Sequence, residues 1–423
     1  MQSVLRICAV AVTLALGAPS VVRASEKVVG GSVESLLDYA KERNPEYAGM
    51  RHETDAAGER IGPAGALPDP RLRVEWMDIT RAGEQNPTLS PSRAGSTVYT
   101  LMQDVPWFGK RDLKRDIAAL EAEGAKGRAL GTWAELSSRI KSGYAQFYYA
   151  HRNERLTNEL LDLLSRLEKV AQVRYAGGLA AQSDAIRAQV EQTRLRNELI
   201  ALENEKRMTQ ARLNMLLSRP ADAPLAEPER LRVLPAPVHL DPAALQDRVR
   251  GRNPQLFTED AQLKAAEKNR DLTYRNRYPD FTFGITPTQS RNSIKDWGLM
   301  VEINIPLQQS SRRAQEREAE AMLSAARARK DATANQVLAE LSENLSALDA
   351  ARRTEALITS SLLPQTELTF KAALASYENG KVDFATLLDA QRQIRQAKQN
   401  QIKTQAEAQT RLAAIERLLG EEL

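Results

Sequence analysis

The sequence predicts a mainly α-helical protein with a membrane β-barrel portion. Three observations predict this fold class: long proline-free stretches, four short runs in which apolar and polar residues alternate, and an internal repeat of the whole pattern. Helices and strands have different side-chain periods, so the two kinds of segment can be told apart by pattern. Each half of the chain is expected to contain a helix, two strands and two long helices.

The internal repeat defines the expected domains. Arg43-Asn44-Pro45 recurs as Arg252-Asn253-Pro254, and several tip residues recur in the same order later in the chain. Such self-similarity predicts a duplicated unit. The first repeat is expected over 25–219, a Pro-rich linker over 220–241 and the second repeat over 242–423. The recurring tip residues are Tyr175, Gly178, Ala188 and Gln189, which match Tyr377, Gly380, Ala390 and Gln391.

Composition argues against several classes of function. Lys and Arg number 59 and Asp and Glu number 55, so the net charge of +4 is small for a protein that binds nucleic acid. Three His and one Cys leave little for a metal site or a cysteine nucleophile. Catalytic motifs such as a nucleophile elbow or a phosphate-binding Gly loop are not found. We therefore expect no enzyme, no cofactor, no metal site and no nucleic-acid partner.

The first 24 residues have the features of a secretory signal peptide. They contain no acid, Arg6 precedes an apolar run over 7–18, and small residues follow. The run is well short of the ~20 residues that a spanning helix needs. Cys8, the one cysteine, lies inside this segment. The mature chain is therefore expected to be exported and not lipidated.

Four strands are expected, and by themselves they leave a membrane barrel and a soluble sheet equally open. An opening helix (about 33–61, and 242–276 in the second half) precedes each pair, and Asn-Pro is expected to break it. Period-two alternation gives each strand one apolar and one polar face, and the runs approach the ~9–11 residues of a tilted transmembrane strand. An ordinary soluble sheet lying on a helix is the alternative. The strands are expected at about 71–79, 97–106, 280–287 and 296–306.

Very long helices follow each pair of strands. They are expected at about 110–172 and 181–218, and again at about 312–375 and 383–420. At 1.5 Å per residue the first would extend roughly 95 Å, which no compact core can cover. These helices must therefore pack along one another. Four strands cannot close a barrel in lipid, and eight would enclose little more than side chains, so three copies with twelve strands are expected.

Two tip motifs carry a family resemblance. They are Arg-Tyr-Ala-Gly-Gly-Leu at 174–179 and Ser-Tyr-Glu-Asn-Gly at 376–380, the second continuing as Leu-Leu-Asp-Ala-Gln at 387–391. With the duplicated plan, they make residues 33–420 resemble the TolC-type outer-membrane factors. The segments 66–70 and 103–111 resemble the heavy-metal cation branch of that family. Many members carry a lipidated N-terminal Cys, which this chain lacks.

The resemblance implies a homotrimer with a twelve-stranded barrel in the outer membrane and a periplasmic α-helical barrel. Such a duct conducts its substrate passively from an inner-membrane pump, here of the RND type, and a periplasmic adaptor docks on its tips. The cargo implied is heavy-metal cations. A multidrug or type I secretion duct is the alternative within this class. A secreted soluble coiled-coil structural protein is the alternative from another class.

Site residues are assigned from the resemblance and from residue chemistry. Glycine tolerates positive φ, which a reversal between two long helices requires. Acids near the closed mouth would favour cations, although Thr386 and Val382 replace an acid and an Arg of the family pattern. A solvated surface role for the acids, and core packing for the aromatics, are the alternatives. The expected docking tips are Tyr175, Gly177, Gly178, Leu179, Tyr377, Asn379, Gly380 and Lys381. The expected periplasmic gate is Asp389, Asp383, Asp184 and Tyr377. The expected aromatic belt of the barrel is Trp76, Tyr99, Phe281, Phe283 and Trp297.

Overall fold

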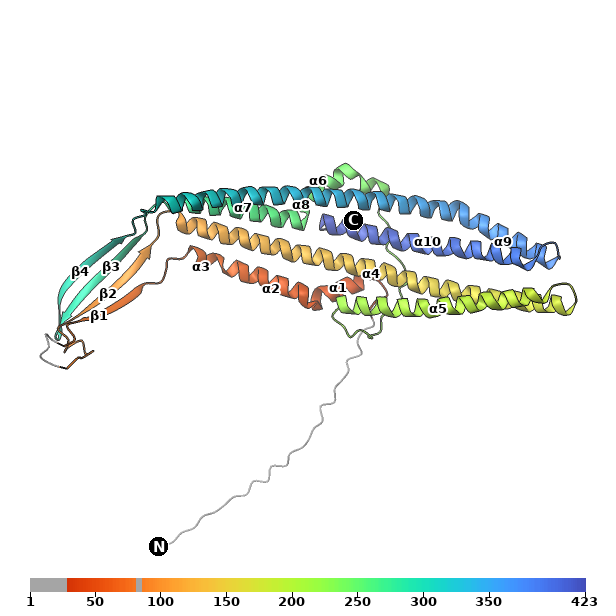
Figure 1. Ribbon diagram of the computed structural model, residues 1–423, viewed down its shortest axis with the longest axis horizontal. Helices are drawn as coiled ribbons and strands as arrows, with labels where there is room; N and C mark the ends of the chain where they lie inside the picture. Colours follow the sequence, from red (N-terminus) through yellow and green to blue (C-terminus); the bar gives the residue numbers. More distant parts are fainter. Residues whose placement is uncertain (1–28, 81–85) are drawn as a thin grey trace, which may run out of the picture.

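The computed structural model describes residues 29–80 and 86–423 as one elongated body. A four-stranded sheet forms one end, long helices lie side by side along the body, and two helix reversals form the other end (Figure 1). The predicted signal peptide lies outside the described residues. Among the described residues, no helix combines the length and apolarity that crossing a membrane requires.

Both repeats open with helices broken at Asn-Pro. The elements are α1 (Val33–Arg43), α2 (Pro45–Glu59) and α3 (Ile61–Gly65), then α6 (Pro242–Arg252) and α7 (Pro254–Arg275). Asn44 caps α2 by accepting from the Tyr47 N–H at 3.0 Å, and its amide donates to the Leu216 carbonyl at 2.8 Å. Asn253 caps α7 in the same way and donates to the Leu418 carbonyl at 2.8 Å. The repeated motif therefore ties each opening helix to the end of a long helix.

The sheet joins the two repeats edge to edge. Strands β1 (Arg71–Met77), β2 (Ser96–Val105), β3 (Phe281–Ser290) and β4 (Ser293–Ile303) are antiparallel in the order β1-β2-β3-β4. The first strand is shorter than expected because Asp78 adopts a positive φ of 52°. The second pair reaches a tight turn at Arg291, whose φ is 59°, so β3 runs past the expected end and β4 begins earlier than expected.

The register places most of the large apolar residues of all four strands on one face. Val74 lies opposite Tyr99, Leu101 opposite Ile285, and Phe283 opposite Val301, and opposed residues in a ladder share a face. The other face is polar, with Arg71 paired to Asp104 at 2.8 Å and Thr282 donating to Asp104 at 2.7 Å. The apolar face comprises Leu72, Val74, Trp76, Tyr99, Leu101, Val105, Phe281, Phe283, Ile285, Trp297, Leu299, Val301 and Ile303.

The long helices form two hairpins. They are α4 (Lys110–Ala176) with α5 (Gln182–Leu216), and α8 (Gln309–Leu357) and α9 (Leu363–Glu378) with α10 (Phe384–Leu419). The helix expected over 312–375 contains a π-helical turn at Ile358–Leu362. Pro364 explains it, because proline has no N–H to donate and clashes with the carbonyl four residues earlier.

Packing between the hairpins continues along the whole body. At mid-length the buried Lys141 of α4 pairs with Glu416 of α10 at 2.9 Å, and Arg232 of the linker pairs with the same acid at 2.8 Å. Near the tips one apolar core combines α4, α5, α9 and α10. Its fully buried members include Leu164, Leu195, Phe384 and Leu387.

Candidate functional site at the helical tips

The two helix reversals use the same backbone motif. After α4, the Leu179 N–H donates to the Arg174 carbonyl at 2.8 Å and the Gly178 N–H to the Tyr175 carbonyl at 2.9 Å. After α9, Lys381 donates to Ser376 at 2.8 Å and Gly380 to Tyr377 at 3.0 Å. Both glycines have a φ of +69°. This is the Schellman arrangement, which needs a left-handed residue and so favours Gly at these positions.

Arg174 connects the two reversals. Its guanidinium donates to the Glu378 carbonyl of the other tip and lies over the Tyr377 ring, 5.1 Å from the centroid. It also donates to the Leu179 carbonyl of its own tip at 3.4 Å. A charged donor that binds two carbonyls and an aromatic face fixes the spacing of the tips. Leu179 remains 70% exposed and Tyr175 48% exposed, so the tips present apolar surface.

Tyr377 is buried between the helices at the tips. It is 2% exposed and packs edge-on against Phe384, with ring centroids 5.3 Å apart. Burial, followed by the charge of Asp184, raises the pKa of the Tyr377 hydroxyl. That hydroxyl has no hydrogen-bond partner within the described part of the chain. The Asp184 carboxylate lies close enough to the Tyr377 hydroxyl to raise its pKa, and the role of these two residues at the gate stays a prediction.

Asp383 has a local structural role. It is the N-cap of α10, where its carboxylate accepts from the Thr386 N–H at 2.9 Å and the Thr386 hydroxyl at 2.6 Å. These hydrogen bonds lower the pKa of Asp383. Asn379 and Lys381 lie exposed in the same reversal. Both of these hydrogen bonds of Asp383 lie within the first turn of α10, and its predicted role at the gate stays a prediction. The next acid along α10 is Asp389.

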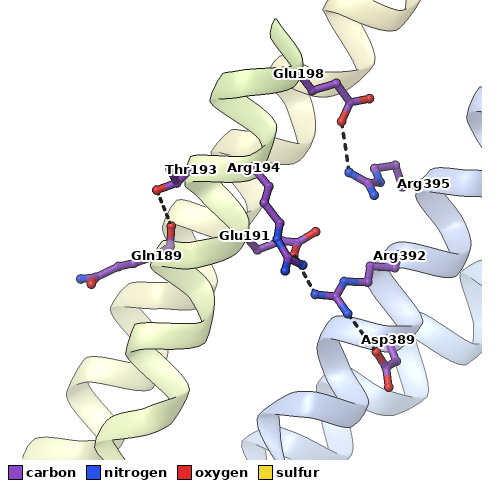
Figure 2. A network of polar contacts seen from close by, with 8 residues as sticks. All are labelled: Gln189, Glu191, Thr193, Arg194, Glu198, Asp389, Arg392 and Arg395. Atoms are coloured by element: carbon purple, nitrogen blue, oxygen red, sulfur yellow. Dashed lines mark hydrogen bonds and ion pairs between the residues drawn. The ribbon is translucent and has the colours of Figure 1, made fainter.

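Asp389 belongs to a network between α5 and α10 (Figure 2). Its side chain is 67% exposed and lies 3.5 Å from Arg392. Arg392 also pairs with Glu191 of α5 at 2.7 Å, and Glu191 is only 2% exposed. Burial disfavours the charged form of Glu191, but the hydrogen bond and charge of Arg392 outweigh it and lower its pKa. Arg194 adds a longer contact at 3.4 Å.

A second bridge lies further from the tips. Arg395 of α10 pairs with Glu198 of α5 at 3.2 Å, and Gln399 donates to the same carboxylate at 2.7 Å. Helix α5 packs mainly on α4, and α10 packs mainly on α4, α8 and α9. The two helices have few contacts with each other. These polar bridges join α5 directly to α10, beside the apolar core that α4, α5, α9 and α10 share near the tips. We call Glu191, Glu198, Arg392 and Arg395 the hairpin bridge.

Sequence reasoning missed the hairpin bridge. One signal was available for Glu191, because it lies at helical spacing between Ala188 and Leu195, which are both fully buried. An acid on such an apolar stripe must find a cationic partner. The partner itself could not be found by spacing, since Arg392 lies 201 residues further along the chain.

The expected aromatic belt falls into two rows. Phe281 and Phe283 lie near the helices, where Phe281 packs on Trp107 at 5.7 Å and Trp107 stacks on Tyr278 at 5.1 Å. Trp76 and Tyr99 lie toward the opposite end of the sheet, where the Tyr99 hydroxyl donates to Gln289 at 3.1 Å. Trp297, opposite Pro287, is 71% exposed. Along the strands, at ~3.3 Å per residue, the two rows of aromatic residues are about 20 Å apart. This separation is similar to the height of the apolar band on the outside of a membrane β-barrel.

A metal centre is not evident at the tips or elsewhere in the described residues. No group of three or more His, Cys, Asp or Glu side chains there has the geometry to hold a metal ion. His151 packs edge-on against Phe147, and burial lowers the pKa of its imidazole.

Comparison with known proteins gives consistent results over nearly the whole chain. The family model for outer membrane efflux protein matches residues 36–219 and 245–421. The cobalt-zinc-cadmium resistance protein CzcC of Cupriavidus metallidurans is 23% identical over 396 residues, which is 92% of this chain and 90% of CzcC.

Solved structures show the same architecture. The outer membrane protein VceC of Vibrio cholerae is 17% identical with a TM-score of 0.77, and the match covers 92% of this chain and 96% of VceC. The transmembrane channel protein CusC is also 17% identical with a TM-score of 0.77, covering 93% of each chain. The predicted fold class, helical with a small β portion, is confirmed by this likeness.

Proposed function

Because the chain belongs to the outer membrane efflux protein family, we propose that three copies of it form the exit duct of a tripartite efflux system. The observation that carries the proposal is the sheet, with one continuous apolar face, one polar face and two unpaired edges at β1 and β4. Unpaired backbone groups in lipid cost several kcal/mol each, so the edges must pair with other copies. Twelve strands from three chains would close a barrel with a polar lumen.

The helices supply the periplasmic part of the duct. Two hairpins per chain, and six per trimer, would continue the barrel as a helical tube that ends at the two reversals. The exposed Leu179 and Tyr175 offer a periplasmic adaptor apolar contact area beside rigid glycine turns. The resemblance to the TolC-type outer-membrane factors implies that the energy would come from an inner-membrane pump of the RND type.

The hairpin bridge is proposed to hold the mouth of the duct closed. Arg392 and Arg395 attach α10 to acids of α5, and separating the hairpins would break both ion pairs. The buried Glu191 would then lose its partner, which makes opening costly without an adaptor. Asp184 of α5, Asp383 and Asp389 at the start of α10, and Tyr377 of α9 remain proposed gate residues.

Heavy-metal cations are the proposed cargo. The support is the likeness to CzcC, whose name states cobalt, zinc and cadmium resistance, together with the segments at 66–70 and 103–111. A deletion strain should become sensitive to such cations and regain resistance when the gene is restored. Sensitivity to dyes and detergents alone would instead favour the multidrug duct.

Membrane extraction tests the duct itself. The protein solubilised from isolated outer membranes in mild detergent should have a protein mass of about three protomers, measured by light scattering corrected for detergent. A soluble periplasmic monomer would contradict the proposal and favour the secreted coiled-coil alternative.

A further inference from the structure

Exposed cations surround the junction between sheet and helices. Lys114 of α4, Arg275 of α7, and Arg313 and Arg317 of α8 are all exposed, and we call them the junction collar. Figure 1 shows the starts of α4 and α8 and the end of α7 meeting the sheet at this level. Among the described residues, none of the four lies within 4.0 Å of an acidic side chain.

Three acids of this region form ion pairs with cations outside the collar. Asp280 pairs with Lys110 at 2.8 Å, and Glu316 with Arg277 at 2.5 Å. One turn further from the sheet, Asp116 pairs with Lys268 at 2.9 Å. Lys114 helps to lower the pKa of Asp280 through its charge, without a hydrogen bond to it. Arg313 acts on the pKa of Glu316 in the same way. The four collar cations thus take part in no ion pair among the described residues, and Glu318, next to Arg317, is the exposed acid beside them on α8.

Apolar side chains lie directly on the sheet side of the collar. Phe108 precedes Lys114 and is 80% exposed, and Leu307 precedes Arg313 and is also 80% exposed. In the third crossing, Tyr278 follows Arg275 as the chain runs toward the sheet. Three of the four crossings between sheet and helices thus run from an apolar strand end, through a large apolar or aromatic side chain, to a cation, and the fourth, from α3 to β1, carries no collar residue. This order matches the change from hydrocarbon to headgroups in a bilayer.

We propose that the junction collar binds the phosphate headgroups of anionic phospholipids in the leaflet from which the helices emerge. The inference rests on the proposed insertion of the sheet in the outer membrane. Four unmatched cations per chain face a surface of opposite charge, and each contributes on the order of 1 kcal/mol near an anionic membrane. Gln308, Ser311 and Arg312 line a polar hollow of about 320 Å³ at the first turn of α8, which offers further donors to a headgroup.

Thermal unfolding of the delipidated trimer in neutral detergent tests the proposal. The unfolding midpoint is followed while phosphatidylglycerol or phosphatidylcholine is added in mixed micelles, with inorganic phosphate as a third probe. Only phosphatidylglycerol should raise the midpoint. The double variant Arg313→Gln, Arg317→Gln should weaken the apparent affinity for phosphatidylglycerol about 25-fold, since ~1 kcal/mol is about fivefold per residue. Arg329→Gln, an exposed arginine further along the same helix, should bind as the wild type does.

Three outcomes would overturn the collar: an unchanged affinity in the double variant, equal stabilisation by phosphatidylcholine, or the same stabilisation by inorganic phosphate. The first would place the lipid elsewhere, the second would reduce the effect to apolar contact, and the third would indicate a site for small anions. All proteins are first isolated from outer membranes as trimers. A failure at that stage counts against the proposed function, whereas a trimer without lipid selectivity counts against the collar alone.

Discussion

Glu191 of α5 and Arg392 of α10 form a 2.7 Å ion pair in which the acid is 2% exposed and the arginine 41% exposed. The pair joins the two repeats near the tips, where the hairpins otherwise have few polar links. A buried carboxylate needs its cation, while a half-exposed arginine can exchange that acid for water. In the proposed duct, the pair would favour a closed mouth and would separate when a competing contact is offered.

Removing Arg392 should loosen the mouth. Arg392→Ala leaves Glu191 buried with only Arg194 at 3.4 Å, and a buried polar group without its partner costs about 1–3 kcal/mol. We expect more frequent opening of single channels in planar bilayers and greater entry of a large antibiotic into cells. Arg353→Ala removes an exposed pair with Asp349 and should change neither. Equal opening in both variants would exclude Arg392 from the closure.

Low pH should open the same contact. The pKa of Glu191 is lowered from its ordinary value of 4.5 in the folded protein. Its contribution to closure is therefore complete above about pH 4.5 and is lost as the pH falls toward the folded pKa. Channel opening should rise as the pH decreases through this range. In Glu191→Gln the rise should be smaller, because the titrating group is absent, and an unchanged rise would assign the acid response to another carboxylate.

The tip glycines should differ from one another in their tolerance of a methyl group. A Cβ at Gly178 meets no atom within 4 Å, so Gly178→Ala adds only the cost of a positive φ, roughly 1–2 kcal/mol. Gly380 has the same positive φ, and in addition a Cβ there would lie 3.3 Å from the Arg174 guanidinium, which would have to shift. We expect Gly380→Ala to lower the thermal midpoint more than Gly178→Ala does. Gly49→Ala, in an open helical position, should keep or raise it.

Arg174 should affect docking more than assembly. Arg174→Met keeps a long apolar stem but loses the donors to Glu378 and Leu179 and the cation over Tyr377. The two reversals would then no longer be held at one spacing. Adaptor binding, measured with the purified trimer, should fall while the trimer mass stays the same. Loss of the trimer would show that Arg174 is needed for packing of the body, and retained binding would show that tip spacing does not matter.

The sheet could be predicted because strand patterning is local. Leu72, Val74 and Trp76 alternate with charged residues, and a strand puts alternate side chains on opposite faces whatever it pairs with. The register then placed them on the same face as Phe281 and Phe283. The resemblance carried by the tip motifs is confirmed by the family match over both repeats.

The hairpin bridge could not be predicted because it depends on tertiary distances. Arg174, Glu191 and Arg392 each act across elements far apart in sequence, and no spacing rule connects them. The π turn before Pro364 also escaped the pattern, since the surrounding residues continue a helix. The ends of β1, β3 and β4 differ from the expected ends for a similar reason. The alternation of apolar and polar residues does not reveal the positive φ at Asp78 and Arg291.

Asp389 remains the predicted selectivity acid, and its neighbour gives a sharp test. Its carboxylate is 67% exposed but lies 3.5 Å from Arg392, so three copies of each would partly cancel at the mouth. Asp389→Asn keeps the shape and removes the charge. We expect the cation-to-anion permeability ratio to fall on the order of tenfold in low salt, since a charged narrow opening concentrates counter-ions by at least that factor. The measurement is the reversal potential across a salt gradient.

Arg392→Ala should shift that ratio in the opposite direction, because it uncovers both Asp389 and Glu191. Asp349→Asn serves as the matched control, since Asp349 is an exposed acid of α8 that pairs with Arg353 and should not alter selectivity. An unchanged ratio in Asp389→Asn combined with a raised ratio in Arg392→Ala would transfer the selectivity role to Glu191. The acid that matters would then be one that the closed arrangement keeps buried.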